Sequence, residues 1–290
     1  MLSSFVITLR EGLEAALIIG LVLAALRKSG AWDLASRVWI GAGGAVGISL
    51  VSGAILFLAV GSLPEAIGQI VEGIAGLLAV AVLTFMVFWM RSQATQMSVD
   101  IKDRVRSAAA LGSGWAIGFL AFVAVLREGL ETALFLYASL TASAGAGRGS
   151  VGAIAGLALA VVLGYAIFRG SVGLNLSRFF QVTGAALVVI AAGMLAYSLH
   201  ELQEVGLVPT VIEHLWDTNY IVSEDGAIGS LLKGLVGYNG NPSLIEVLAY
   251  WAYLGTVGYL FVEPHSRYRG RRKAAGRMEE RRQAVRSGAV

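Results

Sequence analysis

The sequence has no cysteine among its 290 residues. Disulfide bonds, thiolate metal sites and cysteine-ligated iron–sulfur clusters are therefore excluded. Charged residues are scarce at 14%, whereas soluble domains carry about a quarter. Only four prolines are present, and all lie outside or at the ends of long apolar stretches. Because 57% of the residues are apolar and several stretches reach the roughly 20 residues that cross a bilayer, the sequence indicates an integral membrane protein.

The apolar segments predict an all-α integral membrane protein with seven transmembrane helices. The expected spans are residues 3–26, 38–60, 66–90, 112–140, 151–168, 179–199 and 244–262. No basic stretch and no small-residue cleavage site precede the first span. We therefore interpret it as a retained helix and not as a signal peptide.

Basic residues predict the orientation in the membrane. Of the 22 lysines and arginines, 18 fall between spans 1 and 2, 3 and 4, or 5 and 6, or after span 7. The opposite side has only Arg148 and Lys233. Because cytoplasmic segments are enriched in lysine and arginine, we expect the N-terminus outside and the C-terminus in the cytoplasm. The expected location is the cytoplasmic (inner) membrane, as a multi-pass protein.

The pentapeptide REGLE occurs twice, at residues 10–14 and 127–131, inside the first and fourth spans. Each ionisable side chain at the centre of a bilayer costs roughly 3 kcal/mol, so these groups must pair with one another, with water or with a cation. The first and fourth spans run in opposite directions in the expected topology. Spans 1–3 and 4–6 are thus predicted to form a 3+3 inverted repeat plus one helix, a design in which transporters hold substrate near the midplane.

The spacing within each motif places two carboxylates on one helix face, because residues three apart are neighbours there. Carboxylate oxygens are hard ligands that suit magnesium, calcium, manganese and ferric iron. No Glu-x-x-His pair is present, which disfavours a di-iron oxidase core. The alternative is a set of buried ion pairs that only hold the helices together. The candidate metal ligands are Glu11, Glu14, Glu128 and Glu131, with Arg10 and Arg127 as supporting ion-pair partners.

Two REGLE motifs in the first and fourth of seven spans resemble the high-affinity iron permeases, the oxidase-dependent iron transporters of fungi and bacteria, and above all their bacterial EfeU type. The stretches HELQE at 200–204, Trp216-Asp217 and Gly237-Tyr238 fit the same resemblance, which extends to residue 262. It implies transport of ferric iron into the cytoplasm, handled by the four motif glutamates. Iron is then the transported substrate, no cofactor is permanently bound, and the protein is not an enzyme. The implied partners are a ferroxidase or periplasmic iron-delivery proteins.

Other polar residues are candidates for lining the path. They lie in the third span, in the sixth span and at the end of the sixth span, where water at the outer interface could equally account for them. A lone histidine is more often structural than a ligand. The candidates are Glu72, Gln181, His200, Glu201 and Glu204.

The chain is expected to divide into five parts: a first repeat with its cytoplasmic loop (1–110), a second repeat (111–200), an acidic extracytoplasmic loop (201–243), the seventh helix (244–262) and a basic cytoplasmic tail (263–290). Residues 200–243 carry six acidic residues against one lysine, which raises the local cation concentration. The tail suits anionic lipid of the bilayer and not nucleic acid. An oligomer is compatible with the sequence. Two alternatives stay open: a transporter of another cation (Mn, Fe(II) or Pb), and a non-transporting membrane enzyme or subunit.

Overall fold

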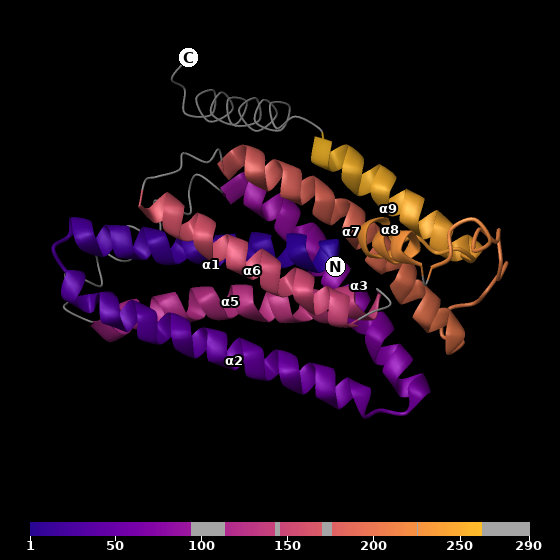
Figure 1. Cartoon of the computed structure of the whole chain (residues 1–290), viewed down its shortest axis with the longest axis horizontal. Helices are drawn as coiled ribbons and strands as arrows, with labels where there is room; N and C mark the ends of the chain where they lie inside the picture. The colour runs from indigo at the N-terminus through magenta and orange to yellow at the C-terminus, as the bar shows by residue number, and fades with distance from the viewer. Residues whose placement is uncertain (94–113, 143–145, 170–175, 225, 263–290) are drawn as a thin grey trace, which may run out of the picture.

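The computed structural model describes residues 1–93, 114–142, 146–169, 176–224 and 226–262, and these parts contain helices and no strand. Seven long helices and two short ones account for almost all of them (Figure 1). The long helices are α1 (Leu2–Lys28), α2 (Ala35–Gly61), α3 (Glu65–Gln93), α5 (Gly114–Thr141), α6 (Ala146–Phe168), α7 (Leu176–Glu204) and α9 (Leu244–Val262), and the short ones are η1 (Trp32–Leu34) and α8 (Ala227–Val236).

Five of these helices are long and apolar enough to cross a membrane: α2, α3, α6, α7 and α9. The other two long helices, α1 and α5, have 27 and 28 residues and so are of similar length. They differ because each carries the three ionisable side chains of one REGLE motif. The described residues therefore confirm an all-helical, multi-pass membrane protein.

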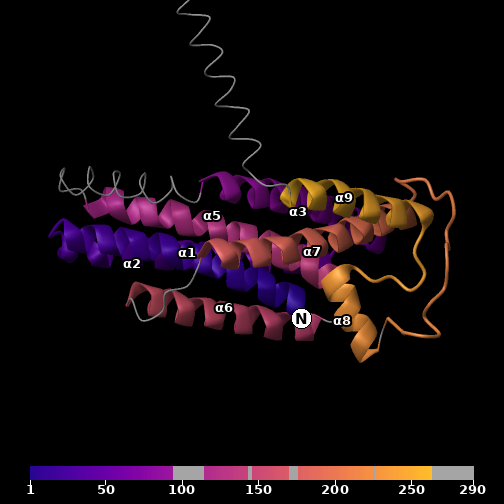
Figure 2. The same ribbon diagram turned by 90° about the horizontal axis from the view of Figure 1, so that it is seen from above.

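The long helices pack in pairs that join the two halves of the chain. The most extensive contacts are those of α1 with α6 and of α2 with α5. In addition, α1 packs against α5, α3 packs against α7, and α9 covers α7 (Figures 1 and 2). If α1, α2 and α3 are exchanged with α5, α6 and α7, the α1·α6 contact becomes the α2·α5 contact. The α1·α5 and α3·α7 contacts are unchanged by the same exchange.

Two close backbone contacts at glycines occupy equivalent positions in the α2·α5 and α1·α6 pairs. Gly41 of α2 faces the backbone of Gly118 on α5, and Gly152 of α6 faces the backbone of Met1 at the start of α1. Met1 and Gly118 are separated by the same 117 positions as the two REGLE motifs. Without Cβ atoms at Gly41 and Gly152, the helix backbones can approach this closely.

The largest apolar cluster lies where α3 and α7 meet. It includes Leu83 and Met86 of α3 and Leu187 of α7, together with Phe135 of α5 and Phe261 of α9. These side chains are between 0% and 8% exposed. This cluster fixes α3 against both α5 and α7, which matters for the candidate site because α3 contacts both motif arginines.

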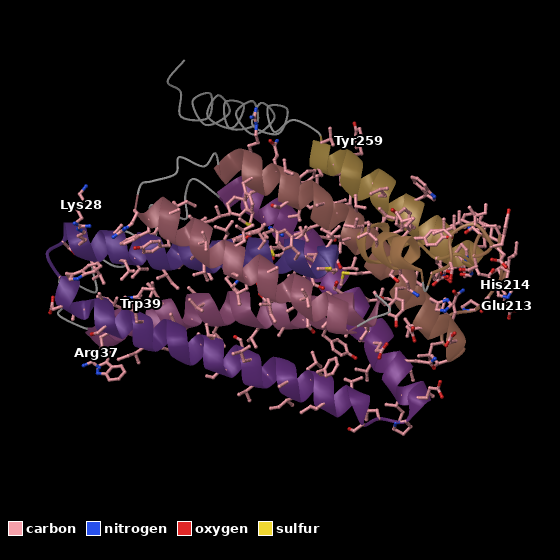
Figure 3. The ribbon with its side chains drawn as sticks, in the orientation of Figure 1. Lys28, Arg37, Trp39, Glu213, His214 and Tyr259 are labelled. Atoms are coloured by element: carbon pink, nitrogen blue, oxygen red, sulfur yellow. The ribbon has the colours of Figure 1, made fainter. Side chains whose placement is uncertain are left out.

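The two ends of the bundle differ in charge. Lys28 and Arg37 lie at one end, and Glu213 and His214 lie at the other (Figure 3). The segment expected as an acidic loop, 201–243, contains helix α8, which ends at Gly237 in a left-handed conformation with φ of 68°. Glycine adopts that conformation without steric cost. The boundary expected at residue 110 and the basic tail 263–290 lie outside the described residues.

Candidate metal centre

Packing of α1 against α5 brings the two motifs together. Carboxylate oxygens of Glu11, Glu128 and Glu131 all lie within 4.8 Å of one another. Glu11 and Glu128 are 1% and 3% exposed, and the Glu131 side chain is 18% exposed. Ligands on opposite sides of a hard cation are two bond lengths apart, or about 4–5 Å. The three oxygens are therefore spaced to surround one ion.

Several oxygens of this cluster have no hydrogen-bond partner. Both carboxylate oxygens of Glu11, Oε2 of Glu128 and Oε2 of Glu131 are buried and accept no hydrogen bond. Leaving a buried charged acceptor unsatisfied is costly, and like charges side by side add to that cost. A hard cation would satisfy all of these oxygens at once.

Glu14 lies outside this cluster and faces Arg10. The Nε atom of Arg10 lies 3.1 Å from Oε1 of Glu14, and its Nη1 lies 3.9 Å from Oε1 of Glu11. Nη2 of Arg10 donates to the sulfur of Met90 on α3 at 3.1 Å. Arg10 is only 2% exposed. The four predicted ligands thus divide into three clustered carboxylates and one carboxylate in a buried ion pair.

The second motif has the same ion pair in a more open setting. Nε of Arg127 donates to Oε1 of Glu131 at 2.9 Å, and the Arg127 side chain is 44% exposed. Its guanidinium carbon lies 4.9 Å from the centre of the Trp89 ring, a cation–π contact. Trp89 and Met90, neighbours on α3, therefore contact one motif arginine each. Sequence reasoning missed both, because no motif marks them.

The predicted path residues occupy different surroundings. The hydroxyl of Tyr197 on α7 donates to Oε2 of Glu72 on α3 at 3.1 Å. Glu201 is 9% exposed near the end of α7, whereas Gln181 is exposed near its start. Gly73 of α3 and Gly184 of α7 occupy equivalent places in the two halves, since Gly73 contacts Ser198 of α7 and Gly184 contacts Val87 of α3. Counted from these glycines, Glu72 corresponds to Thr183 and not to Gln181.

His200 lies at a cavity of about 420 Å³ at the end of the bundle that holds Glu213 and His214. Its Nδ1 atom is 3.0 Å from Oε1 of Glu246 on α9, and its Nε2 atom is 3.4 Å from Oε1 of Glu204. Glu246, which sequence reasoning missed, is 2% exposed. The sequence signal that could have identified Glu246 is its position as an acidic residue in the first turn of the apolar helix α9.

Glu224, in the segment before α8, also lines this cavity. Burial raises the pKa of Glu224, but two contacts outweigh it and hold the pKa below its usual value. Lys233 donates to Oε2 at 2.8 Å, and the backbone N–H of Gly240 donates to Oε1 at 2.8 Å. The carboxylate thus ties α8 to the segment that leads into α9.

Comparisons with known proteins agree with the motif-based resemblance. The profile of the Iron permease FTR1 family matches residues 1–265. The protein named Ferrous iron permease EfeU of Yersinia pestis is 35% identical over 275 residues, which cover 94% of this chain and 97% of the relative. Its namesake from Escherichia coli O6:K15:H31 is 37% identical over 262 residues, 90% of this chain and 95% of the relative. No solved structure shows a significant match. The chain therefore belongs to the iron permease FTR1 family.

Proposed function

We propose that this protein carries iron across the cytoplasmic membrane into the cell through a site formed by Glu11, Glu128 and Glu131. One observation carries the proposal: carboxylates from two helices lie within 4.8 Å of one another, and four of their buried oxygens have no hydrogen-bond donor. Membership of an iron permease family and relatives named permeases support transport rather than catalysis.

The proposed topology has seven spans, with α1–α3 and α5–α7 as an inverted repeat and α9 added. The exchange of helix pairs between the halves supports the repeat. The basic residues Lys28 and Arg37 at one end of the bundle support a cytoplasmic location for that end. The N-terminus is then outside, and the cavity beside His200 opens to the outside.

Charge explains how the site attracts a cation. The two motifs contribute four carboxylates and two guanidiniums, with a formal charge of −2. Arg10 neutralises Glu14, so the excess negative charge rests on the three clustered carboxylates. A divalent or trivalent ion brings the centre close to neutrality without adding a permanent cofactor. Iron enters from the acidic end, where a ferroxidase or a periplasmic iron-delivery protein supplies it.

The donor set favours ferric iron, because it consists of hard oxygen ligands with no thiolate. The second candidate is ferrous iron, which the names of the relatives state for those proteins. Uptake of radioactive iron into liposomes that contain the purified protein separates the two. Ferric citrate and ascorbate-reduced iron are offered in parallel, with manganese(II) and lead(II) as competitors.

The decisive variant is Glu128→Gln, which keeps the side-chain shape and removes one ligand charge. We expect uptake to fall by about tenfold or more, the scale on which metal sites respond to changes even outside their ligand shell. Asp33→Asn, at an exposed position in η1 near the basic end of the bundle, is the matched control and should transport normally. Wild-type uptake by a correctly folded Glu128→Gln protein would refute the proposed site.

A further inference from the structure

A second group of oxygen ligands lies beyond the REGLE cluster, between α3, α5 and α7. It consists of the carboxylates of Glu72 and Glu201 and the hydroxyls of Tyr137 and Tyr197. Tyr197 donates to Glu72 at 3.1 Å and also interacts with Glu201, four residues further along α7. One phenolic hydroxyl has a single hydrogen, so it cannot satisfy both carboxylates.

The two carboxylates lack a basic partner. Among the described residues, no lysine or arginine forms an ion pair with Glu72 or Glu201. The nearby His200 is engaged by Glu246 and Glu204. In the REGLE cluster each motif brings its own arginine, whereas this pair brings none. Two like charges close together, one on the buried Glu201 and one on the half-buried Glu72, are stabilised by a neutralising partner.

Tyr137 supplies an independent observation that points to a ligand. It is 5% exposed, and its hydroxyl has no hydrogen-bond partner. Tyr137 lies one helical turn before Thr141, whose hydroxyl donates to the Tyr137 carbonyl, and Thr141 lines the outer cavity together with Tyr197 and Glu201. Burying an unpaired hydroxyl next to carboxylates that could accept its hydrogen is unfavourable. A cation held by the carboxylates and by the lone pairs of this oxygen would explain the arrangement.

We propose that Glu72, Glu201, Tyr137 and Tyr197 form a second cation site, which takes a hard divalent or trivalent metal ion. Tyr137 follows Glu131 by six residues on α5, so the new site lies about 9 Å further along that helix. It adjoins the cavity of about 420 Å³, since Tyr197, Glu201 and the α5 end residue Thr141 line that cavity. Where the proposed function holds, an ion pauses here between the outer cavity and the REGLE cluster.

The test counts bound metal on the purified full-length protein in detergent. Terbium(III) is the probe, because it is a hard trivalent cation whose luminescence is excited through a nearby tyrosine. Wild-type protein should bind two ions by equilibrium dialysis. The double variant Glu72→Gln/Glu201→Gln should lose one of them. The control Glu65→Gln, at an exposed position on α3, should lose none. An unchanged count in the folded double variant, as proton sharing between the two carboxylates would give, overturns the second site.

Failure of this inference can be told apart from failure of the proposed function. The triple variant Glu11→Gln/Glu128→Gln/Glu131→Gln should lose the other ion and keep the tyrosine-sensitised one. If the triple variant binds no terbium at all, the second site does not exist, although the REGLE cluster does bind metal. If instead the triple variant keeps both ions, the REGLE assignment fails while the second site is judged on its own variants.

Tyr137→Phe separates a ligand from a packing residue. Removing an unpartnered buried hydroxyl should leave the metal-free protein as stable as wild type, or more stable. The same change should weaken terbium binding at the second site and reduce its sensitised luminescence. Unchanged binding and luminescence in Tyr137→Phe would exclude that oxygen from the site and remove the observation on which the proposal rests.

Discussion

The ion pairs of the two motifs should differ strongly in energy although their lengths are similar. Arg10 and Glu14 are 3.1 Å apart, with side chains that are 2% and 6% exposed. Arg127 and Glu131 are 2.9 Å apart, with side chains that are 44% and 18% exposed. The two pairs have the same residue types and similar lengths and differ strongly in burial, although only the exposed pair has the geometry of a hydrogen bond.

The expected magnitudes follow from the two environments. At 3.1 Å and an effective dielectric constant of about 20, two unit charges attract by roughly 5 kcal/mol. Removing one partner of a buried pair strands the other charge and costs about 3–5 kcal/mol. Exposed pairs contribute about 0.2–1 kcal/mol. Glu14→Gln and Arg10→Gln should therefore each destabilise the protein severely, and the double variant should cost much less than their sum.

A double-mutant cycle measures this coupling directly. The free energy of unfolding is obtained in mixed detergent micelles with a chelator present, so that metal binding does not contribute. We expect a coupling of about 2 kcal/mol or more for Arg10 with Glu14, and under about 1 kcal/mol for Arg127 with Glu131. Equal coupling energies for the two pairs would refute the argument that burial sets their strength.

Two further predictions concern packing and pH. Gly12→Ala should destabilise the protein by about 1–3 kcal/mol, because a Cβ there would lie 2.8 Å from Cβ of Ala160. Adding Ala160→Gly should restore the free energy of unfolding. A double variant that is no more stable than Gly12→Ala would contradict the close α1·α6 contact. Since the folded-state pKa of Glu224 is depressed, its stabilising contribution is complete above the usual glutamate pKa of about 4.3 and is lost as pH falls through the folded value. Hydrogen exchange of α8 should accelerate over that acidic range in wild type, and Lys233→Met should reduce the pH dependence.

The helices were predictable because apolar runs and the positions of proline and glycine define them. Each expected span overlaps one long helix, and the two motifs lie on α1 and α5 as the sequence indicated. Burial in lipid requires every backbone group to be bonded within the helix, so length and apolarity mark α2, α3, α6, α7 and α9 as spanning segments. The charges of the REGLE motifs set α1 and α5 apart from them. Helix α8 escaped prediction because ten residues between polar segments resemble an ordinary loop.

The division of labour among the glutamates was not predictable. Helical spacing treats Glu14 and Glu131 alike, since each lies four residues after its motif arginine, yet only Glu131 joins the cluster. Only the packing of α1 against α5 and α3 turns Glu11 toward Glu128 and leaves Glu14 with Arg10. Helical periodicity gives the direction in which a side chain leaves the helix axis. The packing of neighbouring helices determines which charged group lies in that direction.

The difference in exposure between Arg10 and Arg127 predicts which motif communicates with water. A charged side chain that is 44% exposed cannot face hydrocarbon without a large cost, so Arg127 must meet water. Because the protein has no cysteine, single cysteines can be introduced and labelled without a background. Arg127→Cys should react quickly with a water-soluble maleimide in liposomes, whereas Arg10→Cys, made together with Glu14→Gln so that no buried charge is left unpaired, should react slowly. Glu65→Cys, at an exposed helix start, serves as the labelled control. Equal labelling at both motif positions, or protection of Arg127→Cys, would show that the second motif is not the open side of the site.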